Sequence, residues 1–399
     1  MSIKSTLKRP YFRNLDGLRG LFIILIFISH GCAHHAPEVN EHWLAPLIHL
    51  GVVHNSALVL SFFFVMSSFL ITSLLLRERH LDGRIHIGAF YLRRTLRIWP
   101  LYYAILAFAF IGYPFLRSFG SHGYAIDVEI WHYIVFIQNL DLAAGRFPEN
   151  MSLAVTWSLA VEEQFYLLWP LLMAFIPVRH LFPTMLVLLT ATLSWQYVNG
   201  NNYFHTLTCA SDLIIGSLLA IGVFYAQHYR HGLARRWLLS VRRLPRIAVA
   251  ALWLWSLYLY RHGLSEGPVQ LMPFERLVVD LTAGLVLMEQ NYGRYSIFKL
   301  GNVKGMRYLG QLAFGMYLLH APILTALSDI YHLLGWQKTA WDSVFIIPIL
   351  AFGLTVGTAT LCFRYFELPF LRLYSRFLPR TKHPAEKPAN QEQPRVLSA

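Results

Sequence analysis

The chain has 399 residues, of which 56% are hydrophobic and 14% are charged, and its formal net charge is +13. Soluble domains carry about 25% charged residues, so this composition, with a mean hydropathy of +0.44, excludes an ordinary soluble protein. The positive charge by itself would fit a nucleic-acid-binding protein, but its distribution along the chain argues against that class.

Long apolar runs recur along the chain, and a helix needs about 20 such residues to cross a bilayer. Each run is predicted to be a helix, because backbone polar groups in lipid must be satisfied within their own segment. We therefore predict an all-α fold, a polytopic transmembrane bundle of about ten helices. The ten candidate spans are residues 20–35, 56–76, 98–117, 158–177, 181–198, 207–227, 247–261, 273–290, 308–331 and 342–363.

The Lys and Arg residues collect in alternate connections between these spans. When the N-terminus is placed in the cytoplasm, all of them lie on the cytoplasmic side except Arg117, Arg146, Arg261, Arg276 and Lys338. This asymmetry is the positive-inside rule of membrane proteins. It predicts that both termini are cytoplasmic and that the basic surface faces a lipid bilayer, with no nucleic acid as partner.

Both ends of the chain differ from the bundle. The start resembles a signal peptide, with basic residues, an apolar run over 21–28 and small residues at 31–33. His30 beside the apolar run argues against cleavage, so we expect this segment to remain as the first span. The last residues interleave prolines with polar side chains and bury too little apolar surface to fold alone. We expect one transmembrane domain over 1–376 and a disordered, basic cytoplasmic tail over 377–399.

Two further features bound the interpretation. The longest connection covers residues 118–157, and within it Trp131–Leu140 is apolar enough to lie in the membrane interface or to re-enter the bilayer. The three cysteines, Cys32, Cys209 and Cys362, lie in or beside apolar spans and form no CxxC pattern. They indicate neither redox chemistry nor a metal site.

The first candidate site lies in the sequence Leu-Asp-Gly-Leu-Arg-Gly and the apolar run behind it. Arg19 and His30 are eleven residues apart, which on an α-helix places both on one face, about 16 Å apart along the axis. An ionisable residue inside a membrane helix indicates function, and a neutral histidine can take a proton from a hydroxyl. An alternative stays equally open: a histidine bonded to a backbone carbonyl and an arginine that reaches lipid headgroups.

A second cluster, formed by Arg93, Arg94 and Arg97, leads into the third span. Arg94 and Arg97 are i,i+3 neighbours on one helix face, and guanidinium groups bind phosphates through paired hydrogen bonds. A cytosolic donor with several phosphates, such as acyl-CoA, fits this cluster. Taken alone, arginines at the cytoplasmic end of a helix are explained more simply by topology.

A third cluster opens the fourth span, where Ser158, Glu162 and Tyr166 share one helix face. A carboxylate that enters an apolar span is costly, so it needs a partner or a task. Glu162 could orient or charge His30 or hold the hydroxyls of an acceptor, with Ser158 and Tyr166 beside it. The alternative is a structural pairing with an arginine.

The ninth span contains a second intramembrane histidine, His320, in the sequence Tyr-Leu-Leu-His-Ala-Pro. A single histidine in such a place contributes to substrate binding or only to structure, and the sequence leaves both readings open.

In chain order, the motifs LDGLRG with Arg-x10-His, RRxxRIxP, WSLxxExxFYLLxP, LGxxxxxxYLLHxP and a late FELPF resemble the acyltransferase 3 family. The resemblance covers residues 10 to 375. It implies a bacterial membrane O-acyltransferase that modifies cell-surface sugars or related acceptors and lies in the cytoplasmic (inner) membrane. Acyl-CoA, commonly acetyl-CoA, would be its co-substrate, with no permanently bound cofactor.

The resemblance also implies residue roles. Arg19 and His30 match the essential pair of the family, Arg94 and Arg97 match its cytoplasmic RxxR motif, and Glu162 matches its acidic position.

The chain departs from the family pattern near its late histidine. The family usually has Ser-Tyr where this chain has Ala313-Phe314, and Trp on either side of the histidine, where this chain has Leu319 and Ala321. These departures put the role of His320 in doubt. Some members also carry an extracytoplasmic SGNH domain, so this chain would act alone or with a separate extracytoplasmic transferase.

The predicted mechanism has acyl-CoA dock with its phosphates on Arg94 and Arg97, assisted by Arg93 and Arg19. The pantetheine arm then runs along the first helix to His30, which deprotonates the acceptor hydroxyl or carries the acyl group transiently. The competing class is a transporter or flippase of glycans or small molecules, although no inverted repeat is visible. A purely structural scaffold would not need a histidine at that depth.

Overall fold

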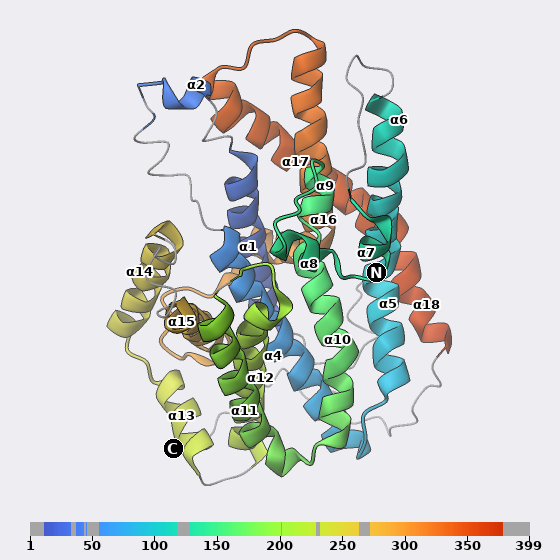
Figure 1. Ribbon diagram of the computed structural model, residues 1–399. Coiled ribbons are helices and arrows are strands. Elements are labelled where there is room, and N and C mark those ends of the chain that lie inside the picture. Colours follow the sequence, from blue (N-terminus) through green and yellow to red (C-terminus); the bar gives the residue numbers. More distant parts are fainter. Residues whose placement is uncertain are drawn as a thin grey trace.

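The protein is built from helices, and no strand occurs in the part of the chain that the structure describes (Figure 1). The computed structural model describes residues 12–32, 37–43, 45, 56–117, 128–200, 202–228, 232–262 and 272–377. The tail predicted over 377–399 lies outside them, apart from the residue that ends the last helix.

Ten long helices occupy the places of the ten predicted spans. They are α1 (Arg13–Gly31), α4 (Ser56–Asp82), α5 (Ile87–Ala107), α10 (Trp157–Phe175), α11 (Val178–Asn199), α12 (Thr206–His228), α14 (Arg246–His262), α15 (Met272–Tyr292), α16 (Lys304–Leu333) and α17 (Ile347–Cys362). Short helices connect them: α2 (Pro37–Asn40), α6 (Tyr113–Arg117), α7 (Ile130–Ile134), α8 (Gln138–Ala143), α9 (Met151–Ala154), α13 (Leu233–Arg242) and α18 (Leu368–Phe377). A π-helical turn joins α5 to α6, and two others flank α17.

Seven stretches among the described residues are long and apolar enough to cross a membrane. They are Arg13–Gly31, Leu58–Asp82, Ile87–Phe115, Val178–Asn199, Thr206–His228, Lys304–Tyr331 and Asp342–Leu373. The other three predicted spans also form helices, but α10 carries two glutamates and a glutamine, α15 carries four charged side chains, and the apolar part of α14 is shorter. The all-helical, multi-span prediction is confirmed. The count of ten spans and the cytoplasmic position of the termini stay predictions.

The connection before α10 folds into short pieces instead of one helix. Within the predicted segment Trp131–Leu140, α7 and α8 are separated by a turn in which Phe136 adopts a positive φ of 59°. The buried side chain of Gln138 donates to the hydroxyl of Tyr102 at 3.1 Å and to Thr156 just before α10. These bonds hold the connection against α5 and α10.

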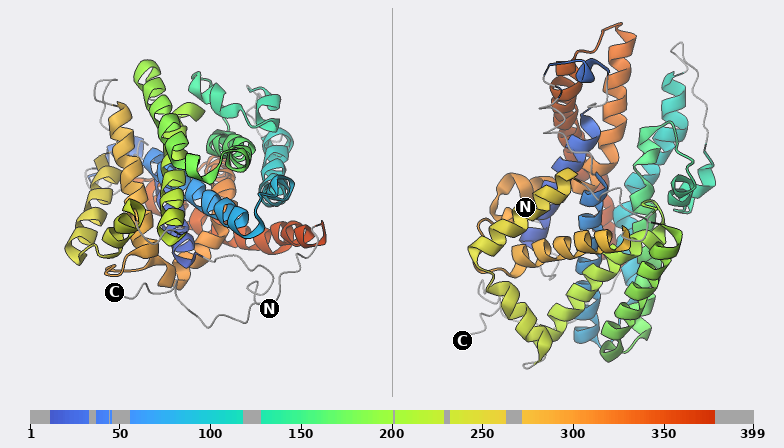
Figure 2. Two further views of the ribbon diagram at one scale, coloured as in Figure 1. Left: turned by 90° about the horizontal axis from the view of Figure 1, so that it is seen from below. Right: turned by 60° about the vertical axis from the view of Figure 1, so that its left-hand side comes forward.

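The first helix lies in the middle of the bundle and packs most closely against α16 (Figure 2). Two glycines make this approach possible, because a Cβ at Gly20 would overlap the backbone of Met306 and one at Gly310 would overlap the backbone of Asp16. Small residues allow such close contact between membrane helices. Asp16 and Gly20, in the first turns of α1, meet residues 306–310 near the start of α16, and His30 at the end of α1 meets His320 further along α16, so the two helices run parallel.

The remaining core is held by apolar packing with a few polar bonds between helices. Thr72 on α4 donates to Ser217 on α12 at 3.0 Å, and Trp169 on α10 donates to Thr72 at 2.9 Å. A Cβ at Gly216 would overlap the backbone of Val65, so α4 and α12 also approach closely. These contacts fix α4 and α10, two helices that carry candidate site residues or their supports, relative to each other and to α12.

Candidate active site

Two histidines from opposite ends of the sequence meet between α1 and α16. The Nδ1 atom of His30 lies 2.9 Å from Nε2 of His320, and Nδ1 of His320 lies 2.6 Å from the carbonyl oxygen of Tyr317. Only 1% of the surface of His320 is exposed, and His30 is half-buried. The imidazole of His30 therefore faces the bundle, where a substrate group would have to meet it.

The start of α10 contacts the same part of α16. The Ser158 hydroxyl lies 2.7 Å from the hydroxyl of Tyr317, which in turn donates to the carbonyl oxygen of Val155 at 2.6 Å. Tyr317 precedes His320 by one helical turn. The polar face of α10 thus begins beside the histidine pair.

The same face of α10 continues with Glu162 and Tyr166, one and two turns further on. The hydroxyl of Tyr166 donates to Oε2 of Glu162 at 3.0 Å and lies 2.7 Å from the hydroxyl of Ser67 on α4. Ser158 and Tyr166 are eight residues apart, so these side chains extend about 12 Å along the axis of α10.

Arg94 lies at the far end of this polar face. Its guanidinium carbon is 5.0 Å from the centre of the Tyr166 ring. Its charged neighbours are Glu162, Arg97 and Arg19. The structure therefore brings residues of α1, α5 and α10 together, and it places Glu162 near an arginine, the alternative that the sequence left open.

The predicted phosphate-binding arginines differ in their surroundings. Arg19 forms an ion pair with Asp16 at 3.1 Å, and Arg93 forms one with Glu78 at 3.2 Å. The side chain of Arg97 is exposed. Since Arg19 and Arg93 each form a direct ion pair while Arg97 is open to solvent, Arg97 is the strongest candidate for contact with a phosphorylated ligand, and Arg94 lies on the same helix face.

Three groups of metal-ligating type meet at the turn between α4 and α5. Glu78, Asp82 and His86 each offer an atom within 4.8 Å of the others. Both oxygens of Glu78 are already engaged, one with His86 at 2.9 Å and the other with Arg93. Ion pairing explains this group, and it supports no metal-dependent step.

Two contacts differ from the expectation that Glu162 orients His30. Among the described residues, the ring of His30 is hydrogen-bonded to His320, and the carboxylate of Glu162 is bonded to Tyr166. Ser67 and Tyr317 also belong to the site, although sequence reasoning gave them no role. Tyr317 was accessible from the sequence, because it lies in the same motif as His320, on the adjacent turn.

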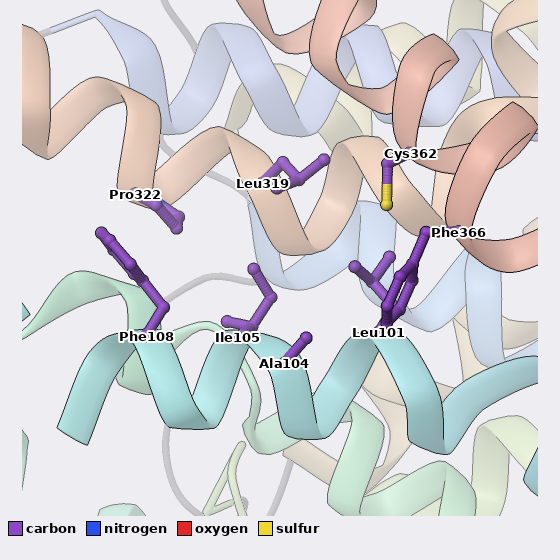
Figure 3. A pocket seen from close by; sticks show the side chains of 8 residues that line it. All are labelled: Leu101, Ala104, Ile105, Phe108, Leu319, Pro322, Cys362 and Phe366. Atoms are coloured by element: carbon purple, nitrogen blue, oxygen red, sulfur yellow. The ribbon is translucent and has the colours of Figure 1, made fainter. Parts of the chain in front are cut away.

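An apolar groove of about 420 Å³ lies on a different face of α16. Figure 3 shows Leu319 and Pro322 facing a row of side chains on α5, with Cys362 and Phe366 closing one end. The lining offers hydrocarbon contacts, while His320 turns toward α1. The groove and the polar face of α10 are therefore separate features.

Known proteins resemble this chain over most of its length. The acyltransferase domain model of the acyltransferase 3 family matches residues 12–363. The chain belongs to this family and is an acyltransferase, which decides the choice between enzyme and transporter in favour of the enzyme. With its apolar helices, it is a multi-pass membrane protein.

Among its relatives is the O-acetyltransferase OatA of Staphylococcus aureus, 28% identical over 396 residues, which cover 93% of this chain and 60% of the relative. The peptidoglycan O-acetyltransferase OatA of Listeria monocytogenes is 25% identical over 382 residues, which cover 90% of this chain and 56% of the relative. The chain thus spans less than two thirds of the length of these relatives. No solved structure matches it.

Proposed function

We propose that this protein is a membrane O-acyltransferase that moves an acyl group from cytosolic acyl-CoA to a hydroxyl of a sugar-containing acceptor. One observation carries the proposal: the polar face of α10 extends from the arginines of α1 and α5 to the histidine pair. A donor with phosphates at one end and a thioester at the other matches such an elongated polar surface.

Arg94 and Arg97 bind the phosphates of the donor, with Arg19 and Arg93 contributing to the positive potential. Guanidinium groups bind phosphate oxygens in pairs, and an i,i+3 pair on α5 presents two of them to one ligand. The exposure of Arg97 supports its access to the cytosol. The pantetheine arm extends along α1, over the roughly 16 Å between Arg19 and His30.

His30 acts as the general base at the inner end of this surface. It takes the proton of the acceptor hydroxyl as the oxygen attacks the thioester carbonyl. The carbon–sulfur bond breaks, and the CoA thiolate leaves with the electron pair and is protonated. Tyr317 packs beside His320 and its hydroxyl contacts Ser158, and these two hydroxyls bind the acceptor or the thioester carbonyl.

Glu162 holds the arginine end of the site. Its bond to Tyr166 and its proximity to Arg94 support this role better than a contact with His30. A carboxylate near a guanidinium compensates its charge inside the bundle, so that Arg94 stays in place between turnovers.

The acceptor is a glycan of the cell surface, and the acyl group is acetyl. The named activities of the relatives, O-acetylation in both and peptidoglycan in the Listeria protein, support this choice. The protein then lies in the cytoplasmic (inner) membrane, where both cytosolic acetyl-CoA and the outer glycan are within reach. Where the acceptor is remote, a separate extracytoplasmic transferase completes the transfer.

The test uses full-length protein in detergent micelles with acetyl-CoA and chitotetraose as a model acceptor. We expect free CoA thiol and acetylated sugar, detected by mass spectrometry, to appear in equal amounts. Thiol release without sugar acetylation would contradict this acceptor class. A comparison of surface glycans between a deletion strain and its parent then identifies the natural acceptor.

A further inference from the structure

The contact between His30 and His320 has the geometry of a well-aligned hydrogen bond. The two ring centres are 5.2 Å apart and the ring planes differ by 15°. This separation is about the sum of the 2.9 Å between the facing nitrogens and the distance from each ring centre to its nitrogen. The line between the ring centres therefore passes close to both nitrogens. The rings lie edge to edge, nearly in one plane, so a hydrogen on one nitrogen points at the lone pair of the other.

The second nitrogen of His320 decides which ring is the donor. Its Nδ1 atom lies 2.6 Å from the carbonyl oxygen of Tyr317. A carbonyl oxygen only accepts, so Nδ1 of His320 carries a hydrogen. In a neutral ring the other nitrogen, Nε2, is then an acceptor.

Neutral His320 is what its surroundings favour. The ring is buried, and its polar neighbours are His30 and the carbonyl oxygens of Tyr317 and Met316. The rings of Phe27 and Tyr317 pack around it, with centres 6.4 Å and 5.7 Å away. A buried imidazolium with such partners would be costly, because no opposite charge compensates it among these described neighbours.

The hydrogen between the two rings therefore belongs to His30. If Nδ1 of His30 were bare, two lone pairs would face each other across 2.9 Å. Nδ1 of His30 donates to His320, and this leaves a free lone pair on Nε2 of His30, the nitrogen on the other side of the ring.

We propose that His320 is a positioning residue, which holds His30 in the tautomer whose Nε2 accepts the proton of the acceptor hydroxyl. The proposal rests on the function proposed above and adds the atom that acts as base. It also gives His320 a different task from the substrate contact and the purely structural role that the sequence left open.

The proton balance of the transfer follows from this assignment. The acceptor oxygen forms its bond to the acyl carbon, and its proton moves to Nε2 of His30. The resulting imidazolium still donates through Nδ1 to His320, whose lone pair stabilises the positive charge. When the carbon–sulfur bond breaks, Nε2 of His30 returns the proton to the CoA thiolate. Throughout the reaction His320 keeps the hydrogen on its own Nδ1, where it is bonded to the carbonyl oxygen of Tyr317.

The test compares His320→Ala and His320→Gln with His30→Ala in full-length protein, with acetyl-CoA and chitotetraose. In a serine protease whose orienting group was neutralised, loss of the correct tautomer lowers turnover by up to roughly 10⁴-fold. For His320→Ala we expect turnover to fall about 10²-fold or more. The KM for acetyl-CoA should stay within about twofold of the wild-type value. The side-chain oxygen of Gln can accept from Nδ1 of His30, so His320→Gln should recover about tenfold of the loss or more.

Two further readouts separate positioning from a structural role. The acidic limb of the pH–rate profile should move to lower pH in His320→Ala, because His30 loses the acceptor that stabilises its protonated form. The double variant His30→Ala/His320→Ala should be no slower than His30→Ala. His205→Gln is the matched control. The ring of His205 lies in the turn between α11 and α12, where it stacks on Trp195 with the ring centres 4.5 Å apart. This variant should keep wild-type kinetics.

Each outcome bears on one proposal. Wild-type turnover and an unmoved pH profile in His320→Ala, with His30→Ala inactive, would overturn the positioning role and leave the base in place. Wild-type turnover in His30→Ala would overturn the proposed function itself. If His320→Ala does not fold, His320→Gln decides: equal inactivity of folded His320→Gln and His30→Ala would contradict rescue through a hydrogen-bond acceptor.

Discussion

The guanidinium of Arg94 lies 5.0 Å from the centre of the Tyr166 ring, and the hydroxyl of that ring donates to Glu162. One aromatic side chain therefore contacts a cation with its face and a carboxylate with its edge. A cation over an aromatic face gains about 0.5–2 kcal/mol, and a hydrogen bond to a charged group contributes about 1.5–3 kcal/mol. Together these contacts explain how two charged side chains are accommodated at this depth.

Tyr166→Phe should separate these two contacts. The ring remains for Arg94, but Glu162 and Ser67 lose their hydroxyl partner, so we expect a loss of about 1–3 kcal/mol of stability. Tyr166→Ala loses the ring as well and should also raise the KM for acetyl-CoA. Thermal unfolding and steady-state kinetics of both variants check this, and an equal KM in the two would show that the ring does not hold Arg94 for the donor.

Arg97→Ala should weaken donor binding more than it slows the chemical step. The side chain is exposed, so its loss removes a phosphate contact without leaving a cavity. We expect the KM for acetyl-CoA to rise about tenfold, as for the loss of one charge-assisted contact of about 1.4 kcal/mol, with kcat within about twofold. Arg179→Ala, an exposed arginine at the start of α11, is the control and should behave like wild type.

Gly310→Ala should impair the protein through helix packing alone. The added methyl would overlap the backbone of Asp16 and push α16 away from α1, which moves His320 from His30. We expect a lower unfolding temperature and at least about a tenfold loss of turnover, as small misplacements of catalytic groups produce. Gly305→Ala lies on the same helix, where an added methyl has nothing within 4 Å, and it should be neutral.

Two buried aspartates lie between α12 and α15, and replacing each of them with asparagine should affect the stability of the protein differently. Arg276 is 1% exposed and bonded to both oxygens of Asp212, at 3.0 Å and 2.7 Å. Asp212→Asn leaves this guanidinium without its carboxylate partner and should cost about 3–5 kcal/mol. Asp280 is also buried and close to Asp212, and Asp280→Asn should be tolerated, because Arg276 keeps its partner. Thermal unfolding decides, and equal destabilisation would contradict the assignment of the pair.

The sequence predicted the parts of the site that local patterns can specify. Helical spacing placed Arg19 with His30 on one helix face and Ser158 with Tyr166 on another. The order of the family motifs along the chain assigned Arg94 to the same site. Apolar runs likewise located the ten long helices. Where polar side chains interrupt the runs, as Glu162 and its neighbours do in α10, composition alone no longer distinguishes a span from a helix of another kind.

The pairing of His30 with His320 was beyond such patterns, because it joins residues 290 positions apart. A weak signal existed: each histidine follows a glycine by ten residues, Gly20 on α1 and Gly310 on α16, and both glycines allow close backbone contact. The same spacing on two parallel helices brings the histidines to a similar height. One sequence holds no information on which two helices are partners, so this signal could be used only after the fold was known.

The most direct measurement is the turnover of His30→Ala at saturating acetyl-CoA, together with its affinity for acetyl-CoA. We expect turnover to fall by about 10²–10⁴-fold, as for the loss of a general base, while acetyl-CoA still binds with wild-type affinity through the arginines. Wild-type turnover in this variant, in protein that folds normally, would contradict the assignment of His30 as the general base.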